Sequence, residues 1–474
     1  MATRNETADV VVIGAGPAGY PCAIRLAQLG KKVTVIEKAE VGGVCLNRGC
    51  IPSKALIHAG KTFEGLNHLD TMGIENAGAK PKINMPKLIA WKETVVKKLT
   101  GGVSGLLKAN GCTVIAGDAK FTSPKTLEVK AGNDTIQLTF NQCVIATGSR
   151  PAKLPGFEVD QKRIIDSTGA LSLEQLPKTM LCIGGGYIGL ELGTFYSKAG
   201  TKVTVVEAFP TLLGSIDPDL TRVVAKKLDK SGVAVHLKTS VKGCKVTSKG
   251  VEVTLQPEGA AARTETFDTV LVTIGRTPNN ENLGLDKAGV KLDSKGFIPV
   301  DAQRRTNVAN IYAIGDIAGQ PLLAHKGTKE GLVAAEAIAG KKVAYDVVAI
   351  PAVVFTDPEI ATVGMTEAEA KAKGIAVKVG QFPYAANGRA LSVGEPDGMA
   401  KIVGDAKTGR LLGVHIVGAE ASNLISEAAL ALEMGAAVED LALTVHPHPT
   451  LPEILMEGAE VALGHPIHVF TKRA

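Results

Sequence analysis

The sequence lacks several features that mark whole classes of protein. Aromatic residues make up only 4% of its 474 residues, and no apolar run approaches the ~18 residues that suggest a membrane-spanning helix. Its 53 basic and 47 acidic residues are interleaved, without a long Lys/Arg block or a basic stripe with aromatic residues between the charges. These absences predict a protein that binds neither nucleic acid nor a membrane.

Cysteine is scarce as well. The seven cysteines are an odd number and are scattered apart from one close pair, which argues against a secreted disulfide framework and for a reducing compartment. The opening residues, MATRNETADV, lack the apolar core of a signal peptide. We therefore expect a protein of the bacterial cytoplasm, or of the mitochondrial matrix if a leader has been removed.

The chain contains the same dinucleotide-binding pattern in two places. Residues 8–37 and 179–207 each have an apolar run, the motif GxGxxG, an amphipathic helical pattern and a β-branched run that ends in Glu. Glu37 follows Gly14 by 23 positions, and Glu207 follows Gly184 by the same 23. One GxGxxG is weak evidence, but two complete copies at one spacing predict an α/β fold with two Rossmann-like domains.

Each residue type of the pattern has a physical role. The first glycine permits a tight turn, the second lets a pyrophosphate approach the backbone, and the third lets the helix pack against the sheet. The helix N-terminus offers free N–H groups to the phosphates, and the Glu accepts hydrogen bonds from ribose hydroxyls. The second Glu is followed by Ala-Phe-Pro with no Arg nearby, which favours NAD over NADP. The residues expected to bind the dinucleotides are Gly14, Gly16, Gly19 and Glu37 in the first copy and Gly184, Gly186, Gly189 and Glu207 in the second.

A pair of cysteines follows the first copy, in GGVCLNRGCIPSK at residues 42–54. Cys45 and Cys50 could bind zinc together with His446 and His448, form a structural staple, be an accident, or act as a redox couple. The zinc spacing is poor, and a chain of this length builds its core without a staple. A redox couple explains more of the surrounding sequence.

The residues around the pair support redox chemistry. Pro52 suits the first turn of a helix, so Cys50 would lie at a helix N-terminus, where the dipole lowers the pKa of a thiol. Lys54 adds positive charge nearby. If these thiols exchange electrons with a flavin, they must contact its ring, which assigns FAD to the first site and NAD to the second.

Thiol exchange also needs a base. Residues 445–453 read VHPHPTLPE, where Glu453 could orient the imidazole of His448. His446 is the rival candidate. Elsewhere, residues 311–317 read IYAIGDI, a strand whose end carries Asp316, which could hydrogen-bond a ribityl hydroxyl of the flavin.

These motifs, together with LLAHKG and VVFTDPEIATVG, resemble the flavoprotein disulfide reductases, and among them most closely the dihydrolipoamide dehydrogenases, from residue 8 to the C-terminus. The resemblance implies NAD-dependent oxidation of protein-bound dihydrolipoamide, with Cys45 exchanging with the substrate and Cys50 facing FAD. It implies a homodimer in which His448 and Glu453 act from the other subunit. The implied partners are the lipoyl domains and acyltransferase core of 2-oxoacid dehydrogenase complexes, or the lipoyl protein of glycine cleavage.

The resemblance also implies further cofactor contacts and no metal. Lys54 would lie near the flavin ring, paired with Glu191. The remaining implied contacts are Gly117, Asp316 and Ala324 for FAD, and Val241 and Gly275 for NAD.

The alternative function on the same scaffold is an NADH-dependent reductase of another disulfide or of a metal acceptor.

We expect four domains or parts of domains along the chain. Residues 1–150 would begin the FAD-binding domain and include a helix around 87–108; residues 151–280 would form the NAD-binding domain; residues 281–350 would form a central part that completes the FAD site; and residues 351–474 would form an α+β dimerisation domain. In this last part we expect short strands around 353–364 and 411–418, then a helix. Its apolar face would carry Leu424, Ala428 and Leu432.

Overall fold

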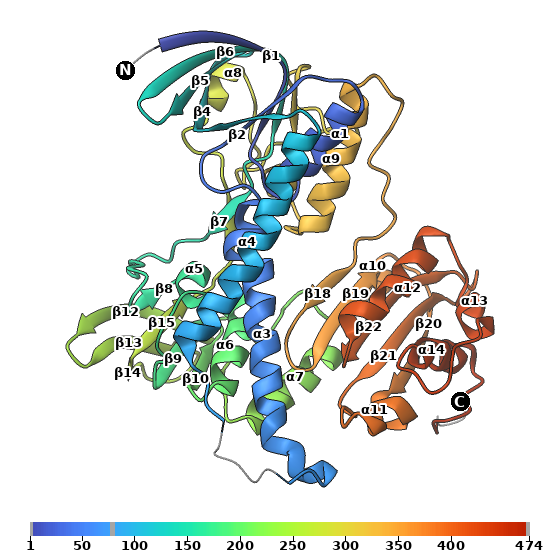
Figure 1. The fold of residues 1–474 in the computed structure, drawn as a ribbon. Helices are drawn as coiled ribbons and strands as arrows, with labels where there is room; N and C mark the ends of the chain where they lie inside the picture. The colour runs from blue at the N-terminus through green and yellow to red at the C-terminus, as the bar shows by residue number, and fades with distance from the viewer. Residues whose placement is uncertain (1–2, 76–80, 471–474) are drawn as a thin grey trace.

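The structure, a computed structural model, describes residues 3–75 and 81–470. Figure 1 shows three sheet-containing lobes, with the long helices α3 and α4 running from the first lobe alongside the second. The mixed α/β class predicted from the doubled fingerprint is confirmed. Within the described ranges no helix is long and apolar enough to cross a membrane.

The first lobe is built on a seven-stranded sheet in the order β3-β2-β1-β6-β5-β4, with β17 added beside β6. Strands β3, β2, β1, β6 and β17 are parallel, whereas β4 and β5 form an antiparallel extension. The apolar run Val10–Ile13 of β1 is buried on both faces, as expected for a central parallel strand. The strands are β1 (Thr3–Ile13), β2 (Val33–Glu37), β3 (Thr113–Ala116), β4 (Asp118–Ser123), β5 (Thr126–Ala131), β6 (Asp134–Ile145) and β17 (Ile311–Ala313).

Helices from distant parts of the chain pack on this sheet or extend from it along the second lobe (Figure 1). Helix α1 follows the first fingerprint and lies beside α9 (Figure 1). The helix predicted around residues 87–108 is confirmed as α4, whose N-cap Asn84 accepts a hydrogen bond from the Lys87 N–H. The helices are α1 (Gly19–Gln28), α2 (Gly43–Arg48), α3 (Cys50–Gly65), η1 (Leu66–Met72), α4 (Met85–Ala109), α8 (Leu285–Ala288), η2 (Gly315–Ala318) and α9 (Ala324–Ile338).

The second lobe repeats the parallel arrangement in a five-stranded sheet of order β11-β10-β9-β15-β8. A three-stranded antiparallel sheet, β12-β13-β14, packs beside it, and the short pair β7 and β16 connects the lobe to the first one. Its strands are β7 (Ser149–Pro151), β8 (Ile164–Ile165), β9 (Thr179–Ile183), β10 (Lys202–Val206), β11 (Ala234–His236), β12 (Thr239–Thr247), β13 (Gly250–Pro257), β14 (Arg263–Phe267), β15 (Thr269–Val272) and β16 (Arg276–Pro278). Its helices are α5 (Ser167–Ala170), α6 (Tyr187–Lys198) and α7 (Pro218–Lys230).

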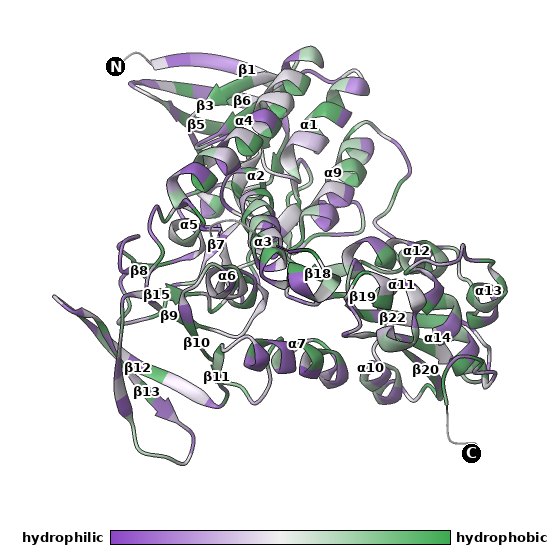
Figure 2. Ribbon diagram, turned by 60° about the horizontal axis from the view of Figure 1, so that its bottom comes forward, coloured by the Kyte–Doolittle hydropathy of each residue, from purple (hydrophilic) through white to green (hydrophobic). Residues whose placement is uncertain are grey.

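The C-terminal lobe is a five-stranded antiparallel sheet, β18-β19-β22-β21-β20, with helices packed on it (Figure 2). The predicted strands and helix are confirmed: Leu424, Ala428 and Leu432 of α12 are all buried. The strands are β18 (Ala352–Val354), β19 (Glu359–Gly364), β20 (Val377–Pro383), β21 (Met399–Asp405) and β22 (Leu411–Gly418). The helices are α10 (Glu367–Ala372), η3 (Tyr384–Ala386), α11 (Gly388–Ser392), α12 (Ala421–Glu433), α13 (Val438–Leu443) and α14 (Glu453–Leu463).

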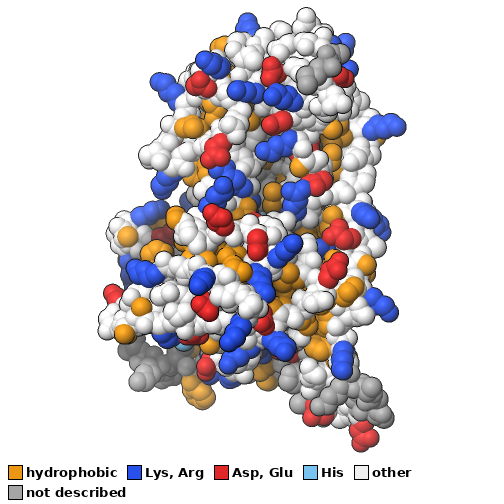
Figure 3. Space-filling model, turned by 90° about the vertical axis from the view of Figure 1, so that its left-hand side faces the viewer, with side chains coloured by type: hydrophobic (Ala, Val, Ile, Leu, Met, Phe, Trp, Pro, Cys, Tyr) orange, Lys and Arg blue, Asp and Glu red, His pale blue; other side chains and the backbone are white. Residues whose placement is uncertain are grey.

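Charge on the surface follows the interleaving seen in the sequence. On the face drawn in Figure 3, Lys and Arg side chains alternate with Asp and Glu side chains, and neither sign forms a continuous stripe. This face therefore offers no extended basic track of the kind that follows a nucleic-acid backbone.

Candidate active site

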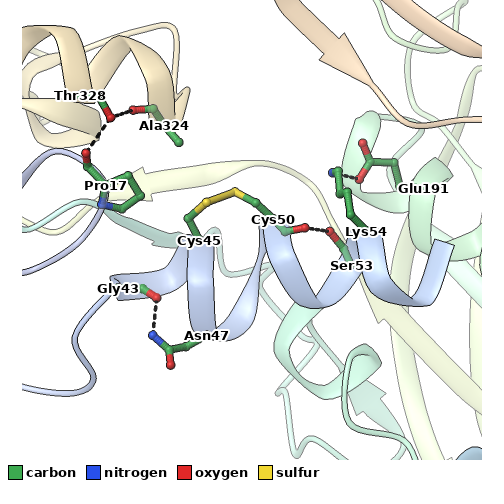
Figure 4. The surroundings of a disulfide bond; sticks show 10 residues. All are labelled: Pro17, Gly43, Cys45, Asn47, Cys50, Ser53, Lys54, Glu191, Ala324 and Thr328. Carbon is green, nitrogen blue, oxygen red and sulfur yellow. Dashed lines mark hydrogen bonds and ion pairs between the residues drawn. A yellow bond between two sulfur atoms is a disulfide. The ribbon is translucent and has the colours of Figure 1, made fainter. Parts of the chain in front are cut away.

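The two cysteines form a disulfide at the junction of two helices (Figure 4). Cys45 lies within α2, and Cys50 is the first residue of α3, so the predicted helix start at Cys50 is confirmed. The preceding turn needs glycine: Gly43 has φ +58°, and a Cβ there would come within 2.7 Å of the Gly16 Cα. The cysteine segment therefore packs directly against the first fingerprint turn.

A cavity of about 570 Å³ lies at this junction, within the roughly 300–1,000 Å³ typical of cofactor and ligand sites. Both cysteines line it, so the disulfide faces a site large enough for a cofactor. The predicted site residues that line the cavity are Gly14, Gly16, Glu37, Cys45, Cys50, Lys54, Gly117, Glu191, Asp316 and Ala324.

The glycines of the two fingerprints occupy matching environments. Gly14 and Gly184 have φ +105° and +106°, and a Cβ at either would collide with a backbone carbonyl, at 2.4 Å from Ala146 O or 2.5 Å from Thr273 O. By contrast, a Cβ at Gly186 would meet nothing within 4 Å. Both turns are therefore closed on the sheet side. The second is open at the helix N-terminus, as phosphate binding requires, whereas a Cβ on Gly16 of the first would lie 3.8 Å from the Gly43 Cα.

The third glycine of each copy serves helix packing. A Cβ on Gly19 would lie 2.0 Å from Gly14 O, and one on Gly189 would lie 2.4 Å from Gly184 O. Gly19 accordingly lies behind the turn and is not part of the cavity wall.

The two glutamates are held in the same way. Glu37 accepts hydrogen bonds from the N–H groups of Ala15 at 2.7 Å and Ala39 at 2.8 Å. Glu207 accepts them from Gly185 at 2.7 Å and Phe209 at 2.9 Å. Each carboxylate is thereby fixed against its own glycine turn, where the remaining lone pairs fit the hydroxyls of a dinucleotide ribose.

Lys54 and Glu191, far apart in sequence, meet at the cavity wall. Lys54 Nζ lies 2.8 Å from Glu191 Oε2 (Figure 4), and the Glu191 side chain is only 4% exposed. The other carboxylate oxygen of Glu191 accepts a hydrogen bond from the Phe355 N–H at 2.9 Å, and the Lys54 ammonium lies 4.4 Å from the centre of the Phe355 ring. The pair, with Glu191 buried and Lys54 partly exposed, places a cation on the cavity wall one helical turn after Cys50.

Asp316 belongs to a network that the sequence did not indicate. It lies in the 3₁₀ turn η2 and accepts a hydrogen bond from the hydroxyl of Ser149. Arg276 in turn donates through Nε to that hydroxyl and through Nη2 to the Ser149 carbonyl, both at 2.8 Å. Tyr187 also lines the cavity. The only sequence signal was that Ser149 and Arg276 follow Gly turns at the ends of apolar strands.

The second group of predicted residues lies in the other nucleotide lobe, outside this cavity. Gly275 follows β15 with φ +121°, and Val241 lies in β12 against the adjoining apolar core. Helix α6 connects the two sites: its N-cap is Gly186 of the second fingerprint, and its Glu191 reaches the first cavity.

His448 and Glu453 form a pair in the C-terminal lobe. His448 Nδ1 lies 2.9 Å from Glu453 Oε1, and Glu453 Oε2 accepts a hydrogen bond from the Thr450 N–H at 2.7 Å. Burial by itself would raise the pKa of Glu453. The hydrogen bonds from Thr450 and, second, from His448 outweigh this effect, so the pKa is lowered. Neither side chain is among the described residues that line the cavity, so one chain does not bring the pair to the disulfide.

The rival histidine has a different environment. The His446 side chain is 4% exposed and is bonded to Glu427 at 2.9 Å and to the Thr444 carbonyl at 2.8 Å, whereas the His448 side chain is 77% exposed. Within the ranges that the structure describes, no group of three or more His, Cys, Asp or Glu residues could hold a metal ion. The zinc alternative needs His446 and His448 beside the cysteines, but the cysteines are joined to each other and neither histidine lines their cavity.

Comparison with known proteins agrees with this arrangement. A family profile described as pyridine nucleotide-disulphide oxidoreductase matches residues 8–331, and one described as the dimerisation domain of the same family matches residues 350–459. A dihydrolipoyl dehydrogenase of Geobacillus stearothermophilus is 51% identical to the chain, over 98% of each sequence. One of Bacillus subtilis is 49% identical, over 97% of each sequence. The chain belongs to the dihydrolipoyl dehydrogenase family. Among solved structures, LpdA of Mycobacterium tuberculosis matches with a TM-score of 0.89 at 29% identity, covering 96% of this chain and 99% of its own.

Members of the wider disulfide reductase group share the same architecture. The HOCl-induced flavoprotein disulfide reductase RclA of Escherichia coli matches with a TM-score of 0.85 at 28% identity, over 96% of this chain and 99% of its own. The fold is therefore common to dihydrolipoyl dehydrogenases and to reductases of another kind, and the family membership rests on the higher sequence identities.

Proposed function

We propose that the chain is an NAD-dependent dihydrolipoyl dehydrogenase, which oxidises protein-bound dihydrolipoamide and forms NADH. The observation that carries the proposal is the Cys45–Cys50 disulfide on the wall of a dinucleotide-sized cavity. The near full-length identity to dihydrolipoyl dehydrogenases supports the same substrate.

The disulfide gives the reaction its first steps. One thiolate of dihydrolipoamide attacks Cys45 Sγ, the Cys45–Cys50 bond breaks, and Cys50 leaves as a thiolate. The second substrate thiol loses its proton to His448 and displaces Cys45, which releases lipoamide as the oxidised disulfide. The chain then holds the two electrons in the Cys45 and Cys50 thiolates, with the second proton of the substrate on His448, and bound FAD would carry that electron pair onward to NAD⁺.

Other residues of the cavity would hold and tune the cofactor. Glu37 fits the ribose of the adenosine half, and Asp316 fits the hydroxyls of the ribityl chain. Lys54, paired with Glu191, would stabilise negative charge on the flavin and on the Cys50 thiolate. The corresponding NAD contacts are Glu207 and the glycines of the second fingerprint, with Val241 and Gly275 at their side.

The pair His448 and Glu453 would act on the cavity of a second copy of the chain. Support comes from the dimerisation domain and from large apolar side chains exposed next to the pair, among them Leu443 at 73% and Val445 at 92%. Such uncovered apolar surface is typical of an obligate interface. A homodimer would bury it and deliver His448, oriented by Glu453, to the partner's disulfide.

The domain division expected from the sequence is part of this proposal, with residues 1–150 and 281–350 serving FAD, 151–280 serving NAD and 351–474 serving dimerisation. We also propose that the lipoyl group arrives on a partner protein, the lipoyl domain of a 2-oxoacid dehydrogenase complex or of glycine cleavage. The bacterial relatives favour a cytoplasmic setting for these partners.

The test is anaerobic mixing of the purified, flavin-loaded protein with dihydrolipoamide, followed by NAD⁺, while the visible spectrum is recorded. We expect two-electron reduction with a long-wavelength thiolate-to-flavin band and then NADH formation. Cys45→Ser and Cys50→Ser should abolish this reduction and still bind FAD. Reduction by NADH but not by dihydrolipoamide would instead assign the chain to reduction of another disulfide or of a metal acceptor.

A further inference from the structure

A buried ion network lies behind the turn that carries Asp316. Lys326 and Glu330 stand one turn apart on α9, with side chains only 3% and 1% exposed, and Lys326 Nζ lies 3.3 Å from Glu330 Oε2. Lys326 belongs to the motif LLAHKG, and neither residue lines the cavity. The catalytic steps proposed above use neither of them.

Every polar atom of this pair is directed at the turn η2 or at a balancing charge. The Lys326 ammonium donates to the carbonyls of Gly315 at 3.0 Å and Gly319 at 2.7 Å, which stand at the two ends of the turn. Glu330 Oε2 accepts from the Gly315 N–H at 2.7 Å. Glu330 Oε1 accepts from Arg304 Nη1 at 3.0 Å.

The turn depends on these contacts because its own conformation is unusual. Gly315 and Gly319 have φ +75° and +123°, and a Cβ on Gly315 would come within 2.9 Å of Ala18 Cβ, beside the first fingerprint. A 3₁₀ turn of four residues has little internal hydrogen bonding. Buried carbonyl and N–H groups without partners would cost free energy, so the side chains of α9 stabilise this conformation of the turn.

We propose that Lys326 and Glu330 are positioning residues for FAD: they clamp both ends of the turn Gly315–Gly319 and so fix the backbone and carboxylate of Asp316 on the cavity wall. The inference rests on the proposed use of this cavity by FAD. On the opposite side, Ser149 donates to Asp316 and is itself held by Arg276. Within the turn, the Ile317 carbonyl accepts a hydrogen bond from the Ile298 N–H at 2.9 Å, so the contribution of the α9 pair is to hold the two glycine ends.

The experiment compares two buried lysines, Lys326 on α9 and Lys401 on β21, of which only Lys326 contacts the turn. Lys326→Met is matched by Lys401→Met, because the Lys401 side chain is likewise only 4% exposed and its carboxylate partners do not line the cavity. Those partners are Asp217, Asp219 and Glu367. FAD is removed from each protein, and its dissociation constant is measured by titration of flavin fluorescence, with thermal unfolding of the flavin-free forms alongside. We expect both variants to unfold at lower temperature and only Lys326→Met to weaken FAD binding, by about tenfold or more.

A second pair of variants separates a clamp from a general loss of packing. Glu330→Gln keeps an oxygen that accepts from the Gly315 N–H, whereas Glu330→Leu removes it. We expect FAD affinity to fall less for Gln than for Leu, and the visible bands of the bound flavin to shift in the Leu variant. These two variants decide the matter if Lys326→Met does not fold.

The possible failures are distinguishable. Equal FAD affinity in Lys326→Met and wild type, or equal weakening in Lys326→Met and Lys401→Met, would overturn the clamp and leave the proposed function intact. Failure of the unaltered flavin-free protein to bind FAD at all would overturn the proposed function, and the clamp with it.

Discussion

At the scale of single residues, two histidines separated by one proline are candidates for the catalytic base. His448 is exposed and oriented by Glu453, whereas His446 is buried and bonded on both ring nitrogens. We expect His448→Gln to lower the rate of dihydrolipoamide oxidation by ~10²–10⁴, as loss of a general base does. Reduction of the bound flavin by NADH should stay unchanged, because that half-reaction does not use the base.

The matched control is His446→Gln, made and assayed in parallel. We expect it to reduce stability through loss of its bond to Glu427 and to leave the rate of the folded enzyme within a few-fold of wild type. Steady-state kinetics with dihydrolipoamide, set beside stopped-flow reduction by NADH, separate the two effects. A larger loss of rate in the His446 variant would reverse the assignment.

Glu453 has a pH dependence whose sign follows from its lowered pKa. The folded carboxyl loses its proton at lower pH than the ordinary Glu value of about 4.3, so its bonds to Thr450 and His448 contribute stability above that value. The contribution is lost as pH falls through the folded pKa. We expect the difference in free energy of unfolding between wild type and Glu453→Gln to be larger at pH 5 than at pH 3 and to shrink below about pH 4.

Denaturant unfolding at fixed protein concentration, between pH 3 and pH 7, measures that difference. A difference that grows on acidification would show that Glu453 is held protonated, in conflict with a role as the anionic partner of His448.

The residues also show where sequence reasoning stops. The spacing of Gly14 and Glu37, repeated at Gly184 and Glu207, is local, and such a pattern can be read directly from the chain. The network of Ser149, Arg276 and Asp316 joins residues more than 120 positions apart through pairing of the short strands β7 and β16, which no local pattern predicts. The burial of His446 likewise depends on packing of α12 and on nothing in the motif itself.

At the scale of elements, the same strand–turn–helix unit is used twice, with equal geometry at Gly14 and Gly184. Alanine at either position would combine positive φ with a Cβ less than 3 Å from a carbonyl oxygen. We expect Gly14→Ala to yield protein with little flavin, and Gly184→Ala to stay yellow while the KM for NAD⁺ rises by about tenfold or more.

Flavin content from the visible spectrum and the KM for NAD⁺ are read on both variants, so each serves as the control of the other. Loss of flavin in the Gly184 variant would mean that the two units do not bind their cofactors independently. That outcome would indicate coupling through α6, which has Gly186 at its N-cap and Glu191 at the first cavity.

At the scale of the whole molecule, His448 lies apart from the disulfide of its own chain. Under the proposed function, a complete active site therefore requires a second copy of the chain. The disulfide lies between the nucleotide lobes, and the His448–Glu453 pair lies in the C-terminal lobe beside exposed Leu443 and Val445. Sequence patterns indicated an apolar face on α12, but that face is buried within the lobe itself. The expectation of a dimer therefore came from family resemblance and not from periodicity.

Mixed dimers test whether each site is shared between two chains. Cys50→Ser retains His448 but has no disulfide, and His448→Gln retains the disulfide but supplies no base, so each variant alone should be nearly inactive. After the two are co-expressed in equal amounts with different affinity tags, about half of the dimers should be mixed, and each should contain one intact site, which gives about a quarter of wild-type activity. Purification through both tags should raise this to about half. Activity that stays at the level of the single variants in the doubly purified dimers would mean that His448 serves the disulfide of its own chain.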